Sequence, residues 1–268
     1  MMDGRRGAVF AHYWKTAAMA ATSYSGDSPL FLVEYLLRVA RVVVLLSIWR
    51  TILTGHGPVS GFTLGSVLTY TLIAEVFAEQ VTVRTRLDEA LWEGSIATRM
   101  LQPMSMVGQF AADMWGHWSV GLCLFSLPLL LFAPLFGVDA RPDSPPAGGL
   151  FLLSLALAVS VGLAVEFIFG GMVVALQENV WVISRVRNAV ITLLSGSLLP
   201  LALLPWGLGG VFAWLPFASM ASAPLQIYTG TGDTTRLLLV QVGWSLALWP
   251  LARWLWVRHR ERLVGYGG

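Results

Sequence analysis

Six long apolar segments recur along this sequence, and they constrain the fold more than any other feature. Each comes close to, or exceeds, the roughly 20 residues that an α-helix needs to cross a bilayer. Only 12% of the residues are charged, whereas about 25% is usual in a soluble domain. The sequence therefore predicts an all-α membrane protein with six transmembrane helices, at residues 36–54, 62–81, 104–136, 150–176, 188–204 and 237–257.

The stretch from Thr82 to Pro103 carries more charge than a bilayer core accepts. It separates the second and third apolar segments, so we expect it to lie in water beside the membrane, with a helix over residues 84–100. The plainer alternative is that its residues only keep a loop soluble. The candidates for contact with a soluble partner are Arg84, Arg86, Asp88, Glu89, Trp92, Glu93 and Arg99.

The cations are distributed unevenly over the polar stretches. Cytoplasmic loops of membrane proteins carry an excess of Lys and Arg. Placing both termini in the cytoplasm leaves only Arg50, Arg141 and Arg236 outside. Residues 7–25 then precede the first span on the inner side. Aromatic residues and alanines recur there at helical spacing, which predicts a helix lying in the membrane interface.

An apolar stretch rich in proline and glycine lies between the fifth and sixth segments. No continuous helix accommodates so many prolines, and irregular backbone at membrane depth must be sheltered by protein. The sequence therefore predicts a re-entrant hairpin at residues 205–230 on the outer side. Its candidate residues are Pro200, Pro205, Pro216, Phe217 and Pro224.

The sequence lacks the patterns of several enzyme and cofactor sites. A P-loop requires glycines one and six positions before its lysine, and the only lysine, Lys15, has Trp14 and Val9 there. The four histidines are scattered and form no HExxH motif. The net charge of +2 is too small to favour nucleic acid as a partner. We therefore expect a non-catalytic chain that binds no cofactor and no nucleic acid.

Two passages resemble the membrane subunit of an ABC-2 type exporter, a permease of the ATP-binding-cassette class. LDEALWEGSIATRMLQPMS, at residues 87–105, is similar to the intracellular stretch that follows the second span in that family. SGSLLPLALLPWGLGGVFAWLPFASMASAPLQIYTG, at residues 195–230, resembles the exit from its fifth span. The order of surface helix, spans, charged helix and broken hairpin is also similar. The resemblance covers nearly the whole chain and implies a transporter class but no substrate.

This resemblance implies a complex of two permeases and two ATPase subunits. The second permease would be an identical copy or a sister protein, and ATP and Mg would bind to the separate ATPase. Residues 84–100 would form a coupling helix in a cleft of that ATPase, with Trp92 as an apolar anchor. Because arginine replaces lysine almost throughout, we expect a GC-rich bacterial source and a place in the bacterial plasma (inner) membrane.

Two polar stripes are candidates for a translocation path along the dimer axis, which the resemblance places beside spans one, two and five. They are Thr63, Ser66 and Tyr70 in the second apolar segment, and Asn188, Thr192 and Ser195 in the fifth. Since Phe, Leu and Trp would form the remaining wall, we expect export of an amphiphilic or hydrophobic small molecule from the cytoplasm. Small polar residues also serve as packing contacts between membrane helices, so both interpretations stay open.

Acidic residues within the apolar segments suggest a different class of transporter. Glu75 and Glu166 would relay protons in an ATP-independent, ion-coupled transporter or channel, because buried charge in lipid is costly and often functional. The structural alternative is ion pairing with Arg84, Arg86, Arg185 or Arg187. A membrane scaffold with no substrate is a third possibility.

Overall fold

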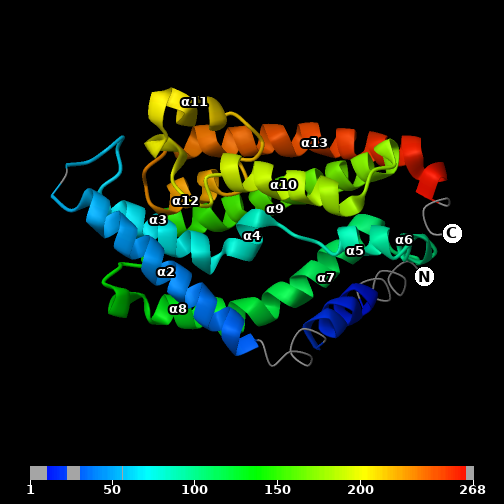
Figure 1. Cartoon of the computed structure of the whole chain (residues 1–268), viewed down its shortest axis with the longest axis horizontal. Coiled ribbons are helices and arrows are strands. Elements are labelled where there is room, and N and C mark those ends of the chain that lie inside the picture. Colours follow the sequence, from blue (N-terminus) through cyan, green and yellow to red (C-terminus); the bar gives the residue numbers. More distant parts are fainter. Residues whose placement is uncertain (1–10, 23–30, 56, 264–268) are drawn as a thin grey trace.

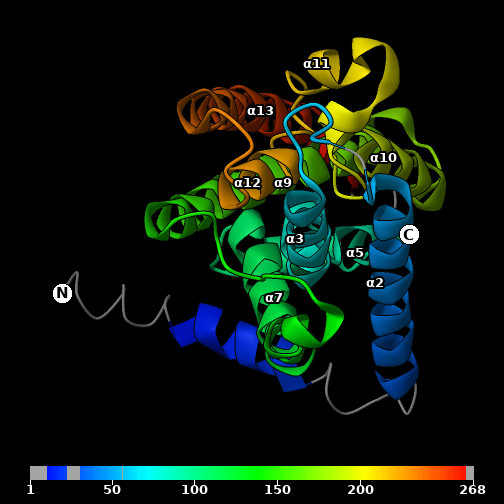
Figure 2. The same ribbon diagram turned by 90° about the vertical axis from the view of Figure 1, so that its left-hand side faces the viewer.

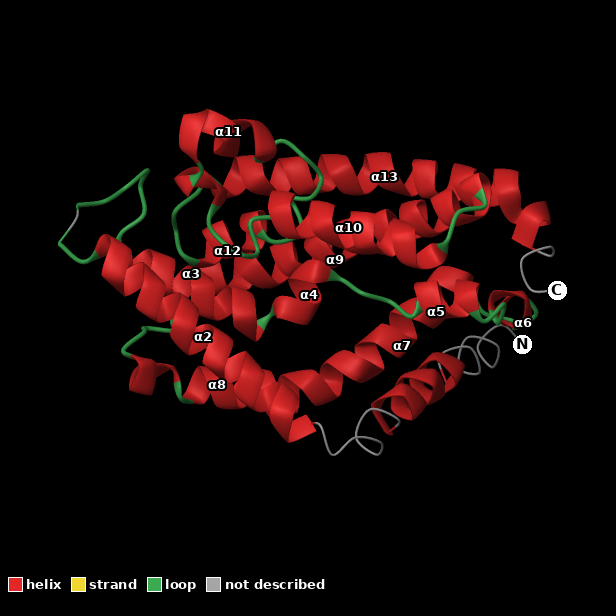
Figure 3. Cartoon of the chain, in the orientation of Figure 1, coloured by secondary structure: helices red, strands yellow, loops and turns green. Residues whose placement is uncertain are grey.

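The structure, a computed structural model, describes residues 11–22, 31–55 and 57–263. Within these ranges it is helical, apart from turns and one isolated bridge between Val59 and Phe62 (Figure 3). The prediction of an all-α fold is therefore confirmed for the described residues. After a helix at 11–22, the helices are α2 Phe31–Leu53, α3 Leu64–Val76, α4 Ala78–Thr82, α5 Leu87–Trp92, α6 Ile96–Met100, α7 Met106–Gly121, α8 Leu127–Leu131, α9 Pro145–Leu176, α10 Val180–Leu194, α11 Leu208–Phe212, α12 Ser222–Tyr228 and α13 Thr234–Leu263. The π-turn η1 covers Leu122–Ser126, and the short 3-10 turns are η2 Ala133–Phe136, η3 Leu201–Leu203 and η4 Pro205–Gly207.

The long helices α9 and α13 lie side by side, with α13 along one edge of the fold (Figures 1 and 2). Polar side chains join them along their length. The hydroxyls of Ser160 and Ser245 are 2.7 Å apart, and Trp256 Nε1 donates to the carbonyl of Phe167 at 2.7 Å. Hydrogen bonds of this kind are stronger where little water competes. The pair therefore provides a fixed scaffold for the rest of the chain.

Two helical stretches among the described residues are long and apolar enough to cross a membrane. They are Met106–Leu131, which joins α7, η1 and α8, and Pro145–Leu176, which is α9. Arg38, Arg41 and Arg50 interrupt α2, and α10 has only 15 residues. The other four spans stay a prediction.

Helix α10 lies earlier in the chain than predicted. The sequence predicts a span at 188–204, but the helix runs from Val180 to Leu194. The Asn179 side chain caps its start, and Gly196, with a φ of 78°, lies just beyond its end. Consequently Arg185 and Arg187, which precede the predicted span, lie inside the helix.

The segment 84–100 is two short helices, α5 and α6, rather than the single helix that the sequence predicts. Gly94 lies between them with a φ of 70°, a left-handed conformation that ends α-helices and suits glycine. Before α5 the chain is non-helical over residues 83–86, which we call the connector. Both helices lie at the end of the molecule opposite α11 (Figure 1).

The predicted interfacial helix at 7–25 is helical over residues 11–22, while positions 7–10 and 23–25 lie outside the described residues. This helix crosses α7 (Figure 2). The contact is close, because a Cβ added at Gly116 would lie 2.1 Å from the carbonyl oxygen of Ala17. Trp14 and Met19 stay exposed. Its location in a membrane interface stays a prediction.

Residues 205–230 fold into η4, α11, a compact turn and α12. Gln241 of α13 holds this region against the scaffold. Its Nε2 donates to the carbonyls of Ser219, at 2.8 Å, and Ser154, at 3.0 Å. Its Oε1 accepts from the Ser154 hydroxyl at 2.8 Å. The hairpin-like shape is thus fixed by neutral hydrogen bonds, and its depth in a membrane stays a prediction.

Candidate functional site

A half-open cavity of about 1670 Å³ lies between α2, α3, α4, α7 and α10. The connector and α5 also line the cavity, as do Ser197 and Leu198 in the turn after α10. The cavity brings together two predicted sets of residues that are distant in sequence. These are the coupling residues Arg84, Arg86, Asp88 and Glu89, and the path residues Asn188 and Thr192.

The chain that enters α5 is seated in a stripe of α9 whose members are four residues apart. A Cβ added at Gly162 would lie 2.4 Å from Val83 Cγ2, and one at Gly170 would lie 2.6 Å from Leu87 Cδ2. Residues four apart share one face of a helix, so Glu166 lies between the two glycines on this stripe. The glycines allow the chain to approach closely on both sides of a carboxylate.

The Glu166 carboxylate joins three segments of the chain. Its Oε1 accepts the backbone N–H of Thr85 at 2.9 Å, and its Oε2 accepts the Arg187 guanidinium. Arg187 also pairs with Asp88 at 3.0 Å. The side chains of Glu166 and Arg187 are 1% and 3% exposed. We call Asp88, Glu166 and Arg187 the Arg187 triad. Because removing one partner would leave charge buried and unpaired, the triad ties α5 firmly to α9 and α10.

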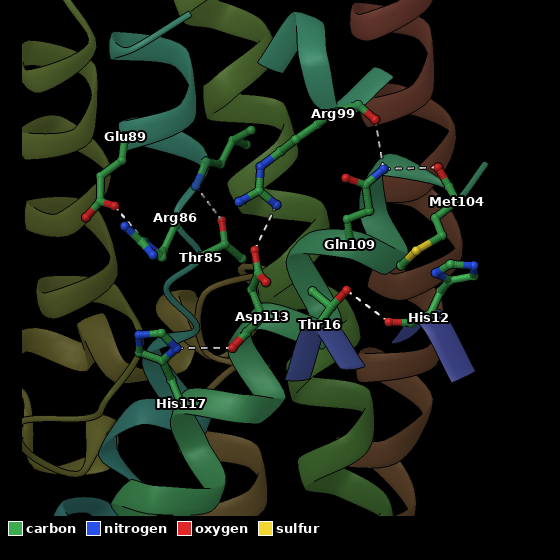
Figure 4. Close-up of polar contacts among 11 residues, drawn as sticks. His12, Thr16, Thr85, Arg86, Glu89, Arg99, Met104, Gln109, Asp113 and His117 are labelled. Carbon is green, nitrogen blue, oxygen red and sulfur yellow. Dashed lines mark hydrogen bonds and ion pairs between the residues drawn. The ribbon is translucent and has the colours of Figure 1, made fainter. Parts of the chain in front are cut away.

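Arg99 holds α6 against α7 (Figure 4). Its guanidinium pairs with Asp113 at 2.8 Å and lies 4.6 Å from the centroid of the Phe110 ring. Gln109 Nε2 donates to the Arg99 carbonyl at 2.9 Å. A cation over an aromatic face adds electrostatic attraction to the ion pair. Arg99, a candidate for contact with a soluble partner, thus anchors its own segment.

The side of α5 and α6 that faces away from the other helices is exposed. Trp92 is 60% exposed, Leu101 is 85% exposed, and Glu93 is exposed too. The Trp92 ring centroid lies 6.2 Å from that of Trp181 in α10. Exposed aromatic and aliphatic side chains grouped on a polar segment indicate an interaction surface. Trp92 and Glu93 are therefore the predicted coupling residues best placed to meet a partner.

Comparison with known families assigns this arrangement to a class of transporter. A family model described as ABC-2 family transporter protein matches residues 39–267, which include most of the cavity lining, α5, α6 and the region of α11 and α12. The chain belongs to the ABC-2 transporter family. It is thus a membrane permease of an ABC transporter, a class that works with ABC ATPase subunits. Among curated proteins no match is found.

In this ABC-2 permease, the acidic residues considered for proton relay are ion-paired. Glu75 lies 3.0 Å from Arg41, Glu166 accepts Arg187, and Arg38 lies 3.5 Å from Glu79. The sequence offers Arg187 as a partner for Glu166, but it did not predict that Arg38 and Arg41 pair with Glu79 and Glu75. Arg38 and Arg41 are three positions apart in an apolar helix, and this spacing could have indicated that both pair with carboxylates of a neighbouring helix.

Two further coupling residues, Arg86 and Glu89, pair with each other. Arg86 Nε donates to Glu89 at 2.6 Å, and about half of each side chain is exposed. This hydrogen bond raises the pKa of Arg86 above its ordinary value, so the guanidinium stays charged. Figure 4 shows the pair beside Thr85, close to Asp113.

Two of the six predicted path residues, Asn188 and Thr192, line the cavity of the permease. Thr63 and Ser66 instead form a reciprocal cap at the start of α3, in which each side chain accepts the other's backbone N–H. Their placement at a helix end explains the hydroxyls. Thr63 and Ser66 therefore cap α3, and neither of them lines the cavity.

Tyr70 and Ser195 are buried rather than placed on the cavity wall. The Tyr70 hydroxyl donates to the Gly196 carbonyl at 2.6 Å, and the Ser195 carbonyl accepts from Ser222 N–H at 2.9 Å. Both residues fix the chain where it leaves α10. For them the packing interpretation describes the geometry better than the path interpretation.

The predicted hairpin residues differ in burial. Pro200 and Pro224 are buried, Pro205 is exposed, and Pro216 and Phe217 are intermediate. Pro224 stands in the first turn of α12, where backbone amides have no partner within the helix. The prolines therefore end and begin short helices at little cost in hydrogen bonding.

Proposed function

We propose that this permease is the transmembrane subunit of an exporter that moves an amphiphilic small molecule out of the cytoplasm. A separate ATPase, which binds ATP and Mg, supplies the energy by docking on α5 and α6. One observation supports this most. The α5 helix exposes Trp92 at its end, and one turn earlier on the same face its Asp88 is ion-paired to Arg187 of α10.

The Arg187 triad gives a route for force. A partner that displaces Trp92 also displaces Asp88, which lies one turn earlier in the same helix. Asp88 is bonded to Arg187, and α10 carries Asn188 and Thr192 on the cavity wall. Packed elements tend to switch between discrete arrangements rather than deform gradually. Docking therefore shifts α10 as a unit and changes the shape of the cavity.

The proposed placement puts α5 and α6 in the cytoplasm and α11 and α12 at the outer face. The distribution of arginines supports this orientation through the positive-inside rule. Both chain termini then lie inside a bacterial plasma membrane. The six spans of the prediction complete this topology, with residues 205–230 re-entering from outside.

A second permease, identical or a sister chain, completes the proposed transporter. Helix α2 exposes Val44, Ile48 and Ile52, and α10 exposes Val182 and Val186. Exposed apolar faces on neighbouring helices are typical of subunit contacts. In a membrane, lipid also covers such faces, so cross-linking between copies through α2 is the direct test.

The exporter proposal is tested by replacing Trp92 with alanine in the permease purified with its native partners. We expect ATPase binding to weaken by at least about ten-fold, because a central aromatic anchor contributes about 2 kcal/mol or more. Trp206→Ala is the matched control, since Trp206 is also exposed but lies in η4, at the other end. Retained binding by both variants would refute docking at α5.

The ion-coupled alternative predicts a different result in the same preparation. If export depends on ATP, efflux from vesicles continues when an ionophore collapses the proton gradient and ATP is kept constant. Efflux that stops under these conditions would favour proton relay through Glu75 or Glu166. The ion pairs of both carboxylates weigh against that role.

A further inference from the structure

We propose that the cavity binds an anionic amphiphile whose negative group is held by Arg84 and Arg185. The site would load the exporter proposed above, and its assignment rests on that function. Arg84 belongs to the connector and Arg185 to α10, and both line the cavity. Three features of the cavity support this assignment: the ion pairing on its wall, the hydrogen-bond donors beside Arg185 and the apolar side chains that line the rest of it.

The pairing of charges on the wall is asymmetric. Every carboxylate that lines the cavity already has an arginine within 4.0 Å. By contrast, Arg84 and Arg185 have no carboxylate within that distance among the described residues. An incoming cation would meet no free carboxylate, whereas an anion would meet two available guanidinium groups. The paired carboxylates are Glu75, Glu79, Asp88, Glu89 and Asp113.

Arg185 is oriented by a contact that leaves its outer nitrogens available. Its Nε donates to the Trp181 carbonyl at 3.3 Å. The planar guanidinium presents further donors that match a carboxylate or phosphate in pairs. Ser184 also lines the cavity, and its buried hydroxyl has no hydrogen-bond partner among the described residues. The first turns of α10 therefore hold unused donors beside the cationic group.

The rest of the wall suits an apolar chain. Met114, Trp118 and Phe125 come from α7 and η1, and Leu37 and Leu198 also line the cavity. A volume of about 1670 Å³ exceeds the roughly 300–1,000 Å³ of common small-molecule sites. A small inorganic anion would leave this apolar surface in contact with water. An acyl or similar chain attached to the anion would cover it.

The test compares three fluorescent probes that share one chain and differ only in their head group. They are an NBD-labelled dodecanoate, its methyl ester and the corresponding amine. Binding is measured without ATP to the full chain in phosphatidylcholine nanodiscs, with signal from empty nanodiscs subtracted. We expect the carboxylate to bind at least ten-fold more tightly than the ester and the amine. Equal binding of the three probes would overturn the assignment.

Substitutions then locate the head group. Arg84→Gln combined with Arg185→Gln should remove the ten-fold preference, whereas Arg84→Lys with Arg185→Lys should retain part of it. Arg236→Gln is the matched control, since Arg236 lies at the start of α13, over the Trp214 ring, and does not line the cavity. A preference that survives the double glutamine variant, with the protein still monodisperse, would overturn the assignment.

Two sources of the anionic amphiphile are separated by competition. Phosphatidylglycerol added to the nanodiscs displaces the probe if a membrane lipid is the natural occupant, and has no effect if an exported solute is. Both results support an anionic site. Because binding is measured without ATP or the ATPase, a failed preference leaves the Trp92 test of the exporter proposal unaffected.

Discussion

Ion pairs join the α5–α6 end of the permease to the other helices, whereas the buried hydrogen bonds at the α11–α12 end are between neutral groups. At the first end, Arg187 pairs with the buried carboxylate of Glu166 and with the partly exposed carboxylate of Asp88. At the second, the Tyr70 hydroxyl bonds to the Gly196 carbonyl, and Gln241 bonds to two backbone carbonyls. Both junctions bury polar groups, so the difference lies in what each loses when one partner is removed.

This difference suits the two proposed roles. An ion pair in a low-dielectric interior is strong but costly to form, and a buried charge that has lost its partner is strongly destabilising. A charged junction therefore holds only when all partners are in place, which suits a segment that responds to an ATPase. Neutral hydrogen bonds tolerate single losses better, which suits a fixed outer structure. Three substitutions test the contrast.

The largest effect is expected for Arg187→Met. It leaves Glu166 and Asp88 without their shared cation, so we expect a loss of about 3–5 kcal/mol in the free energy of unfolding. Denaturant titration of the purified permease in detergent measures this loss. Arg185→Met, on the same helix, should change stability by less than about 0.5 kcal/mol, as exposed positions usually do.

A compensating variant tests whether charge is the cause. Adding Glu166→Gln and Asp88→Asn to Arg187→Met removes the unpaired charges and should recover part of the stability. If the combined variant is no more stable than Arg187→Met alone, the triad contributes by packing and the contrast between the two ends fails.

An intermediate effect is expected for Tyr70→Phe. The change removes one hydroxyl and leaves the buried Gly196 carbonyl without that donor, which costs about 1–3 kcal/mol. The same titration measures it. Tyr13→Phe is the control, because the Tyr13 hydroxyl makes only a 3.5 Å contact with Ser105 near the surface. If Tyr70→Phe lowers the free energy of unfolding as much as Arg187→Met does, the proposed difference between the two ends is wrong.

The smallest effect is expected for Arg86→Gln. Its ion pair with Glu89 is half-exposed, and such pairs contribute less than about 1 kcal/mol. Raising the salt concentration to 1 M shortens the screening length to about 3 Å. At that concentration the variant and the native protein should have the same free energy of unfolding. A large, salt-independent loss would show that charge at this end matters even where water reaches it.

Much of the fold follows from local sequence signals. The apolar run at 150–176 lies within α9, and the proline-rich stretch at 205–230 is broken into short helices as expected. The position of α10 was also readable, since Asn179 is a good cap and Gly196 a good stop. The predicted span began at residue 188 because Arg185 and Arg187 were assigned, on account of their charge, to the polar segment before it, whereas the helix begins at Val180.

The assembly of the site could not be predicted in this way. Asp88 and Arg187 are separated by 99 positions, and no local pattern joins them. The division of residues 84–100 at Gly94 depends on a backbone conformation rather than on residue type alone. Likewise, Tyr70 was assigned to a path from its polarity, whereas its burial against Gly196 depends on tertiary packing.

The seating of the connector on α9 has an evolutionary consequence. Val83 and Leu87 meet Gly162 and Gly170, two turns of helix apart, so the number of residues between them is as constrained as their identity. Inserting or deleting one residue between Val83 and Leu87 would move at least one of them off its glycine. Homologous permeases should therefore align here without gaps, even where exposed positions such as Arg86 have diverged.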